Sequence, residues 1–378
     1  MSDFGSLLQQ FQKDSTKRKP SEEDNNNSNN ASRKRQRRQQ QRDAQDFPPV
    51  KEILVVCPHF VQTGGPEALH QLCDQLNRSQ RVSAKMVYCR TNGFTVSCVL
   101  QPRTPLSYHR YNAPSVDHDP FQEEEEEGGN LSQLLIWPEC WTNQMLDYMS
   151  SGPQPTSPCV IWWLSVDNNT GRFREWERND IIHLYQSEYA RQHLLKNKAT
   201  HILPMTEYIS DPPKPGDKDR TIDVVFNPVK GIHFTDEIRK RSEPLVQFRP
   251  IGGGADGRIR ISPEEVRNLL QQAKVYIDFG PHPGMDRLPR EAALAGCVIV
   301  TNTKGAALYQ QDVPLPQRYK VAKFDTEAIH KLLMDILKNF EERSEEMGHY
   351  RKWINGQAAE MKNCVDNLLI ELIDKRKS

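Results

Sequence analysis

From about residue 50 onward, the apolar positions alternate between two patterns, short continuous runs and stripes with helical spacing. The run 52–57 is almost continuously apolar, which is typical of a strand buried in a parallel sheet. Leu69, Leu72 and Leu76 then recur at intervals that place them on one face of a helix. Further strands are predicted at 85–89, 134–137, 160–164, 181–185, 222–226, 245–248, 275–279 and 297–301. Helices are predicted at 141–149, 187–196, 235–241, 288–295, 328–340 and 345–373, and another begins with a capping box at Ser262 and Glu265.

This alternation predicts an α/β fold with two doubly wound, Rossmann-like parallel sheets. The segment DPPKPG at 211–216 interrupts it, because successive prolines stop both helices and strand pairing. We therefore predict an N-terminal domain at 47–210, a linker at 211–220 and a C-terminal domain at 221–344, with the two domains facing a cleft. The apolar stripe of the last segment, 345–378, predicts a helix that crosses back to the first domain and buries Trp353 near the joint.

Residues 1–46 are rich in Gln, Asn, Ser and charged residues and poor in branched apolar ones, which predicts a disordered tail. Two basic clusters, at 17–19 and 33–38, have the spacing of a bipartite nuclear-import signal. They fit equally well a solvated basic tail that no import receptor binds. We expect a cytoplasmic protein, or a nuclear one if an import receptor binds the tail. A charged insert at 117–130 contains five consecutive glutamates and is predicted to be a loop.

Composition narrows the classes of function. The chain has 50 basic and 50 acidic residues, so its overall charge gives no reason to expect nucleic acid or an anionic membrane as a partner. Its eight cysteines show no Cys-x-x-Cys spacing and no clustering with histidines, which favours reduced buried thiols over disulfides or a zinc site. No run of 18 or more apolar residues occurs, so we predict no transmembrane helix, and the amino end lacks the apolar core of a secretory signal.

The most informative stretch is DFGPHPGMDRLPRE at 278–291, between a predicted strand and a predicted helix. Gly280 and Gly284 let a ligand approach the backbone closely, and the helix directs free N–H groups at the turn. Arg287 and Arg290 offer forked donors suited to phosphate, and Glu291 offers a carboxylate for a ribose diol. The stretch predicts a nucleotide-diphosphate site. The alternative is an ordinary connection in which proline and glycine only shape the turn.

Three further groups of residues follow predicted strands. The glycine turn at Gly64 and Gly65 can admit an anion or a hydroxyl-rich ligand, although it lacks the spacing of a dinucleotide fingerprint. In the turn 227–231, Lys230 can pair with phosphate, or it is a solvated loop lysine. The third group consists of single carboxylates just past strands: Glu139, Asp167 and Glu188. Such carboxylates can bind sugar hydroxyls, act as a base or cap the next helix.

Four segments together resemble glycosyltransferases of the GT-B fold, especially the group-1 (family-four-like) nucleotide-sugar enzymes. They are GGPE at 64–67, YQSEY at 185–189, NPVKG at 227–231 and REAALAGCVIV at 290–300, and the resemblance covers roughly residues 50–375. The last segment is similar to the family's helix in which a glutamate before a run of small residues binds ribose. The resemblance implies that Glu291 holds the ribose and that Lys230 binds the diphosphate. The chain departs from the family at Pro283, where a second glutamate is usual. Either backbone N–H groups and Asp286 replace that carboxylate, or the activity has changed or been lost.

We interpret the chain as a metal-independent glycosyltransferase that uses a nucleotide-sugar as substrate, no cofactor and an unidentified acceptor. Catalytic roles, in stabilising charge or touching the sugar, are expected for Lys230, Arg287 and His282. Donor binding is expected from Asn227, Gly231, Gly280, Pro283, Gly284, Asp286, Arg290 and Glu291. The acceptor or sugar side is assigned to Gly64, Gly65, Glu139, Asp167 and Glu188. Two alternatives stay open: a sugar-nucleotide epimerase or phosphorylase on the same scaffold, and a catalytically silent protein that senses a nucleotide-sugar or recruits a partner.

Overall fold

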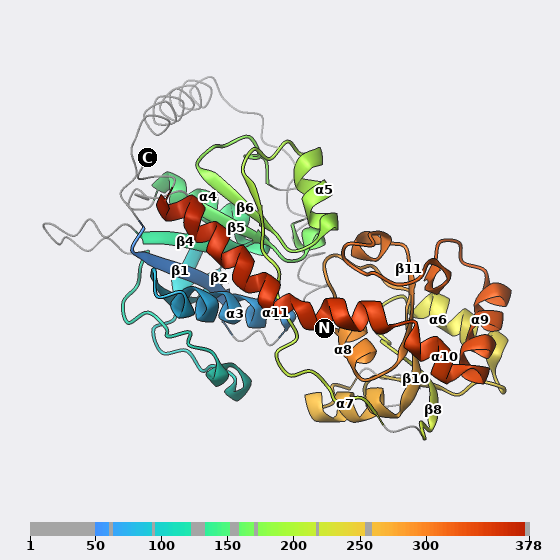
Figure 1. Cartoon of the computed structure of the whole chain (residues 1–378). Helices are drawn as coiled ribbons and strands as arrows, with labels where there is room; N and C mark the ends of the chain where they lie inside the picture. The colour runs from blue at the N-terminus through green and yellow to red at the C-terminus, as the bar shows by residue number, and fades with distance from the viewer. Residues whose placement is uncertain are drawn as a thin grey trace, which may run out of the picture. The chain divides into compact units, whose positions relative to one another are not determined.

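The structure is a computed structural model that describes residues 50–59, 63–92, 95–121, 133–151, 159–169, 173–216, 219–253 and 259–374. The predicted tail at 1–46, with its basic clusters, and the glutamate run at 123–127 lie outside the described residues. The described residues build two mainly parallel sheets with helices around them, and both sheets belong to one compact unit (Figure 1). The predicted α/β fold class is therefore confirmed. Among these residues, no helix is both long and apolar enough to cross a membrane.

The first sheet has the strand order β3-β2-β1-β4-β5-β6-β7, and only β2 and β3 pair antiparallel. Its strands are β1 (Glu52–Pro58), β2 (Ser83–Asn92), β3 (Thr95–Cys98), β4 (Gln133–Pro138), β5 (Cys159–Trp163), β6 (Ile181–Tyr185) and β7 (Ile202–Pro204). Its helices are α3 (Gly64–Arg78), α4 (Thr142–Ser151) and α5 (Glu188–Lys196). In the register of β1, Val55 lies beside Met86 of β2 and Ile136 of β4. We call residues 50–204 the first lobe.

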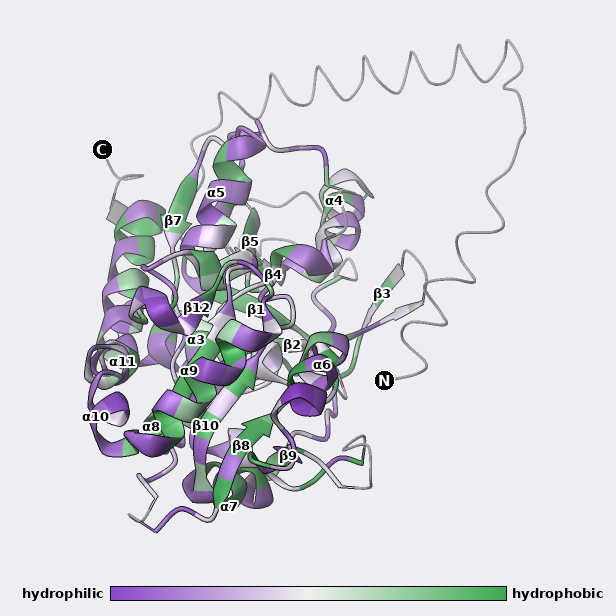
Figure 2. Cartoon of the chain, turned by 90° about the vertical axis from the view of Figure 1, so that its right-hand side faces the viewer, coloured by the Kyte–Doolittle hydropathy of each residue, from purple (hydrophilic) through white to green (hydrophobic). Residues whose placement is uncertain are grey.

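The second sheet has the order β12-β11-β10-β8-β9, with every pair parallel. Its strands are β8 (Ile222–Phe226), β9 (Phe248–Pro250), β10 (Ala273–Asp278), β11 (Val298–Asn302) and β12 (Lys320–Val321). The helices here are α6 (Ile232–Ser242), α7 (Pro263–Gln272), α8 (Arg287–Leu294), α9 (Thr326–Lys338) and α10 (Phe340–Glu345). We call residues 222–345 the second lobe. Figure 2 shows hydrophilic colour over much of α6 and α10, and hydrophobic colour along β7 and the arrow of β8.

Local sequence sets several helix starts. At α7, the Ser262 hydroxyl accepts from the Glu265 backbone N–H at 3.2 Å, and the Glu265 carboxylate accepts from the Ser262 N–H at 2.7 Å. This reciprocal pair is the predicted capping box. At α5, the Ser187 hydroxyl accepts from the Ala190 N–H at 3.1 Å. Both caps satisfy backbone donors that a helix leaves free at its amino end.

The structure differs from the prediction at five elements. The strands β3, β7 and β12 are not predicted, because four, three and two residues are too few to show a period. The strand β9 begins at Phe248, and Leu245 instead lies in an exposed turn. The helix α10 follows α9 as a separate element and is also not predicted. The boundaries 210/211 and 220/221 between the predicted domains stay predictions.

The helix α11 (Gly348–Leu369), with a π-helical turn at Ile370–Asp374, contacts both lobes (Figure 1). Its first residues, such as Tyr350 and Ile354, belong to the core of the second sheet. Its later residues, such as Met361 and Leu368, belong to a core of the first sheet. Trp353 differs from the prediction, because it packs against the second core but is only partly buried.

Candidate functional site

The turns after β8 and β10 meet backbone to backbone. Gly231 has φ +63°, and a Cβ there would lie 2.5 Å from the carbonyl carbon of Phe279. A Cβ on Gly280 would lie 2.5 Å from the Cβ of Lys230. Both positions therefore require glycine, one for its dihedral angle as well as for space. The two glycines bring Lys230 next to the stretch 278–291, as expected for turns at the carboxyl ends of neighbouring parallel strands.

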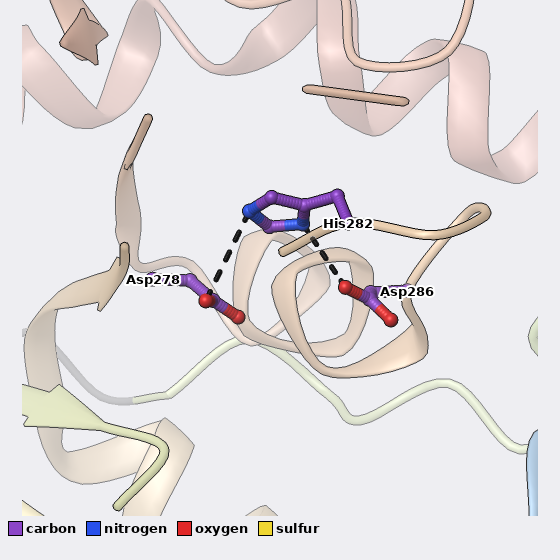
Figure 3. A group of neighbouring side chains, drawn as sticks. All are labelled: Asp278, His282 and Asp286. Atoms are coloured by element: carbon purple, nitrogen blue, oxygen red, sulfur yellow. Dashed lines mark ion pairs between the residues drawn. The ribbon is translucent and has the colours of Figure 1, made fainter. Parts of the chain in front are cut away.

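Four side chains form a charged cluster at this point, which we call the Lys230 cluster: Lys230, Asp278, His282 and Asp286. The Lys230 ammonium lies 2.8 and 2.9 Å from the two carboxylate oxygens of Asp286. His282 Nδ1 lies 3.0 Å from Asp286 Oδ2, and His282 Nε2 lies 3.9 Å from Asp278 Oδ1 (Figure 3). Asp278 also accepts hydrogen bonds of 3.0 Å from the Tyr276 hydroxyl and from a backbone N–H. A buried histidine thus lies between two carboxylates, one of which also pairs with a lysine.

Charge and burial shift the pKa values in the Lys230 cluster. Burial opposes the charged form of Asp286, but its hydrogen bond with His282 and the Lys230 charge lower the pKa of this carboxyl. Burial likewise opposes a charged His282, yet the two carboxylates raise the pKa of its imidazole above the usual value. Burial raises the pKa of Asp278. The cluster therefore favours an ionised Asp286 beside the Lys230 ammonium and a His282 that holds its proton more tightly than usual.

The ligating atoms of Asp278, His282 and Asp286 lie within 4.8 Å of one another, close enough to share a cation. Lys230 already pairs with both oxygens of Asp286. A divalent ion bound there would have to displace the ammonium, and the two contacts between Lys230 and Asp286 would be lost. The donor set therefore fits a lysine-neutralised carboxylate better than a metal centre.

Arg287 begins α8 and joins the second lobe to the first. Its Nη1 lies 2.8 Å from Glu67 Oε2, and its Nε lies 3.5 Å from Glu291 Oε1. A Cβ on Gly64 would lie 2.8 Å from the Arg287 Cδ, so the glycine turn leaves room for the arginine. Glu67 also accepts hydrogen bonds from the hydroxyls of Tyr111 and Ser210. Our site prediction omits Glu67, although it directly follows the glycine turn.

Arg290 points to the interior. Its side chain is 1% exposed and pairs with the equally buried Glu207, which lies just after β7. It also donates to the backbone oxygens of Met285 at 2.8 Å and Asp286 at 3.2 Å. These contacts give the guanidinium a structural role, and donor binding by Arg290 stays a prediction.

The tip of the stretch 278–291 docks on the first lobe through its backbone. The Pro283 carbonyl accepts from the Val166 N–H at 3.0 Å. A Cβ on Gly284 would lie 2.1 Å from the Leu164 carbonyl oxygen, so this glycine permits the close contact. Asn227, at the start of the other turn, accepts from the Val229 N–H at 3.0 Å and shapes that turn.

The carboxylates predicted for the acceptor side make local contacts. Glu139 is buried and accepts from the backbone N–H groups of Leu164 at 3.2 Å and Ser165 at 3.1 Å. Burial raises its pKa to about 7. Asp167 accepts from a tyrosine hydroxyl at 3.4 Å, and Glu188 accepts from two side chains within α5. Among the described residues, none of the three has a hydrogen bond or ion pair with the Lys230 cluster. The contacts of Glu139 fit a structural role, because its buried carboxylate satisfies backbone N–H groups. A Cβ on Gly65 would lie 3.9 Å from the Leu164 side chain, which is an ordinary van der Waals distance.

A cavity of about 580 Å³ lies between the carboxyl ends of β6 and β7 and the helix α11. Its lining includes Gln186, Trp353 and Lys352. Of the predicted site residues, only Glu188 lines it. The cavity is therefore a space beside the predicted donor site and not the site itself.

Comparison with known proteins shows similarity only in structure. No family model matches the chain, and no curated protein matches it in sequence. Sucrose-phosphate synthase from Thermosynechococcus elongatus has a TM-score of 0.58 at 12% identity, over 85% of this chain and 99% of that chain. Anabaena HepE in complex with UDP and glucose has a TM-score of 0.56 at 10% identity, over 85% and 100%. The pneumococcal O-GlcNAc transferase GtfA with UDP and GlcNAc gives 0.54 at 10%, over 85% and 99%. This chain has the GT-B glycosyltransferase fold, as the resemblance in its sequence implies.

Proposed function

We propose that the protein is a glycosyltransferase that moves a sugar from a nucleoside-diphosphate donor to an acceptor. The observation that carries this proposal is the convergence of Lys230, His282 and the start of α8 at the carboxyl ends of β8 and β10. Ligands of doubly wound sheets bind at such strand ends, and a helix start favours an anion. HepE and GtfA, which share the fold, were solved with UDP. UDP is therefore the first nucleotide to test.

The chemistry follows from the charges. When the glycosidic bond to the donor breaks, negative charge grows on the departing diphosphate, and groups that stabilise this charge lower the barrier. In the structure, Lys230 pairs with Asp286, and Arg287 pairs with Glu67 and Glu291. Donor binding would exchange carboxylate partners for phosphate oxygens. No step of this scheme requires a metal ion, because the two cations and the α8 amino end supply the positive charge.

Pro283 occupies the position of the family's second glutamate, and its carbonyl is committed to the first lobe. The Asp286 carboxylate is held by Lys230 and His282. We propose that Glu291 holds the ribose and that His282 faces the transferred sugar. Because the usual carboxylate is replaced, we assign neither retention nor inversion of the anomeric carbon.

A second candidate, a catalytically silent nucleotide-sugar-binding protein, is favoured by one observation. Both cations proposed for the diphosphate already have carboxylate partners within 3 Å. Such pairing reduces the positive charge available to a leaving group. This candidate predicts donor binding without turnover.

Calorimetry with UDP and a set of UDP-sugars tests the donor site. Lys230→Ala should weaken binding at least about tenfold, as for the loss of a charge-assisted contact. Lys274→Ala is the matched control, because Lys274 lies at the opposite end of β10 and pairs with Asp223. Equal affinities of the two variants would reject the site. Release of UDP from a bound donor in the presence of candidate acceptors then separates the transferase from the silent protein.

A further inference from the structure

A cavity of about 360 Å³ lies in the first lobe, beside α3, and we call it the aromatic cavity. Its floor consists of four nearly buried rings, those of His70, Tyr88, Tyr108 and Tyr111. Exposed polar side chains at its edge include His109 and Asn112. Its volume falls within the range of small-molecule sites, about 300–1,000 Å³. A buried aromatic floor with a polar edge is the usual composition of a site that orients one ligand.

The lining consists of aromatic rings, imidazoles, hydroxyls, an amide and small apolar groups. Among the described residues, no carboxylate, lysine or arginine side chain lines the aromatic cavity. The His70 nitrogens lie 2.6 Å from the Pro66 carbonyl oxygen and 2.6 Å from the Tyr88 hydroxyl. Burial lowers the pKa of His70, against the opposing effects of that carbonyl and of Glu67, and so disfavours a charged ring. The cavity therefore suits an uncharged ligand better than a phosphate or a charged peptide.

Rings and hydroxyls together fit a sugar. The C–H face of a pyranose packs on aromatic rings, while its hydroxyls exchange hydrogen bonds with phenol, imidazole and amide groups. The rings of His70 and Tyr108 lie 4.4 Å apart between centroids, so the floor is formed before any ligand binds. We propose that the aromatic cavity binds an uncharged carbohydrate, and that this carbohydrate is the acceptor. The role as acceptor rests on the proposed function, whereas the binding does not.

A chain of polar contacts connects the aromatic cavity to the donor side. The Tyr111 hydroxyl donates to the Glu67 carboxylate at 2.8 Å, and Arg287 pairs with the other oxygen of that carboxylate at 2.8 Å. The Tyr108 hydroxyl donates to the Thr63 carbonyl at 3.3 Å, at the start of the glycine turn. A sugar on these rings therefore lies two polar contacts away from an arginine proposed to hold the diphosphate. These contacts place the aromatic cavity on the first-lobe side of the proposed donor site.

The test is saturation-transfer NMR on the full chain with methyl glycosides of glucose, galactose, mannose and N-acetylglucosamine, and with phenol as the aromatic control. We expect at least one glycoside to bind better than phenol. The double variant His109→Ala/Asn112→Ala should bind it about tenfold more weakly, as for the loss of two hydrogen bonds. Ser107→Ala is the matched control, because this exposed residue of the same segment does not line the cavity. It should bind like the wild type.

Two results overturn the proposal: phenol that binds more tightly than every glycoside, and equal glycoside affinities of the double variant and Ser107→Ala. UDP binding is measured on the same samples, and thermal melting checks that each variant is folded. If UDP binds and no glycoside does, the cavity proposal fails alone. If a glycoside binds in the cavity and neither UDP nor any UDP-sugar does, the proposed function fails while the carbohydrate site stands.

Discussion

The Arg287 guanidinium lies 2.8 Å from the Glu67 carboxylate, so an ion pair closes the space between the glycine turn of the first lobe and the start of α8 in the second. Both side chains are about four-fifths buried, which makes this pair less screened than a surface one. In the proposed donor site, a diphosphate at α8 would compete with Glu67 for the same guanidinium. On this proposal, Glu67 would link occupancy of the donor site to the contact between the lobes.

Glu67→Gln should tighten UDP binding several-fold, because it removes the carboxylate that competes with phosphate for Arg287 while it keeps the side-chain volume. Calorimetry at two salt concentrations measures the effect, which should shrink at high salt. Glu264→Gln, a change at an exposed position of α7, is the control. Unchanged or weaker UDP binding in Glu67→Gln would show that Arg287 does not bind the diphosphate.

Gly231→Ala should destabilise the protein by about 2 kcal/mol or more and weaken UDP binding. Its left-handed backbone alone costs about 1–2 kcal/mol for a residue with a Cβ, and that Cβ would meet the Phe279 carbonyl carbon at 2.5 Å. Urea unfolding measures the change in the free energy of unfolding. Gly348→Ala is the control, since a Cβ there meets nothing within 4 Å. Equal stability of the two variants would contradict the tight contact between the turns.

Local signals in the sequence predict much of this fold. Continuous apolar runs predict β1, β5, β6 and β8, and the pair Ser262 and Glu265 predicts the start of α7. Residues close together in the sequence determine these features, so a single sequence can show them. The short strands β3 and β7 depend on pairing with a longer neighbour, which no local pattern records.

The sequence also predicts only part of the candidate site, for a similar reason. The sequence places Lys230 and the stretch 278–291 at strand ends, and the structure brings them together. The sequence cannot show that Arg287 pairs with Glu67 while Arg290, one turn later on α8, pairs with Glu207. Which face of a short helix is buried depends on contacts from the other lobe, and Glu207 lies in an irregular segment after β7.

Arg290→Met should cost about 3–5 kcal/mol of stability, because it leaves the buried Glu207 carboxylate without its cation. The double variant Arg290→Met/Glu207→Leu should recover part of this loss, since it buries no unpaired charge. Urea unfolding of the single and double variants makes this comparison. A single variant within about 1 kcal/mol of the wild type would mean that the pair is not buried as described.

The Lys230 cluster should make the stability of the protein depend on pH. Folding raises the pKa of His282 above its ordinary value of 6.5, because the pull of Asp286 and Asp278 outweighs the cost of burial. The folded state therefore holds this proton more tightly than the unfolded state does. The resulting stabilisation is fully present below about pH 6.5 and is lost as the pH rises through the folded-state pKa.

His282→Gln should remove this component, so the free energy of unfolding should fall less steeply with pH than in the wild type. Urea unfolding from about pH 5.5 to about pH 8.5 covers the window, which extends upward from the unfolded pKa. His233→Gln, an exposed histidine of α6, is the control and should keep the wild-type slope. If His282→Gln and His233→Gln show the same slope, then His282 does not hold its proton more tightly in the folded state, and the described pull of its two carboxylates is contradicted.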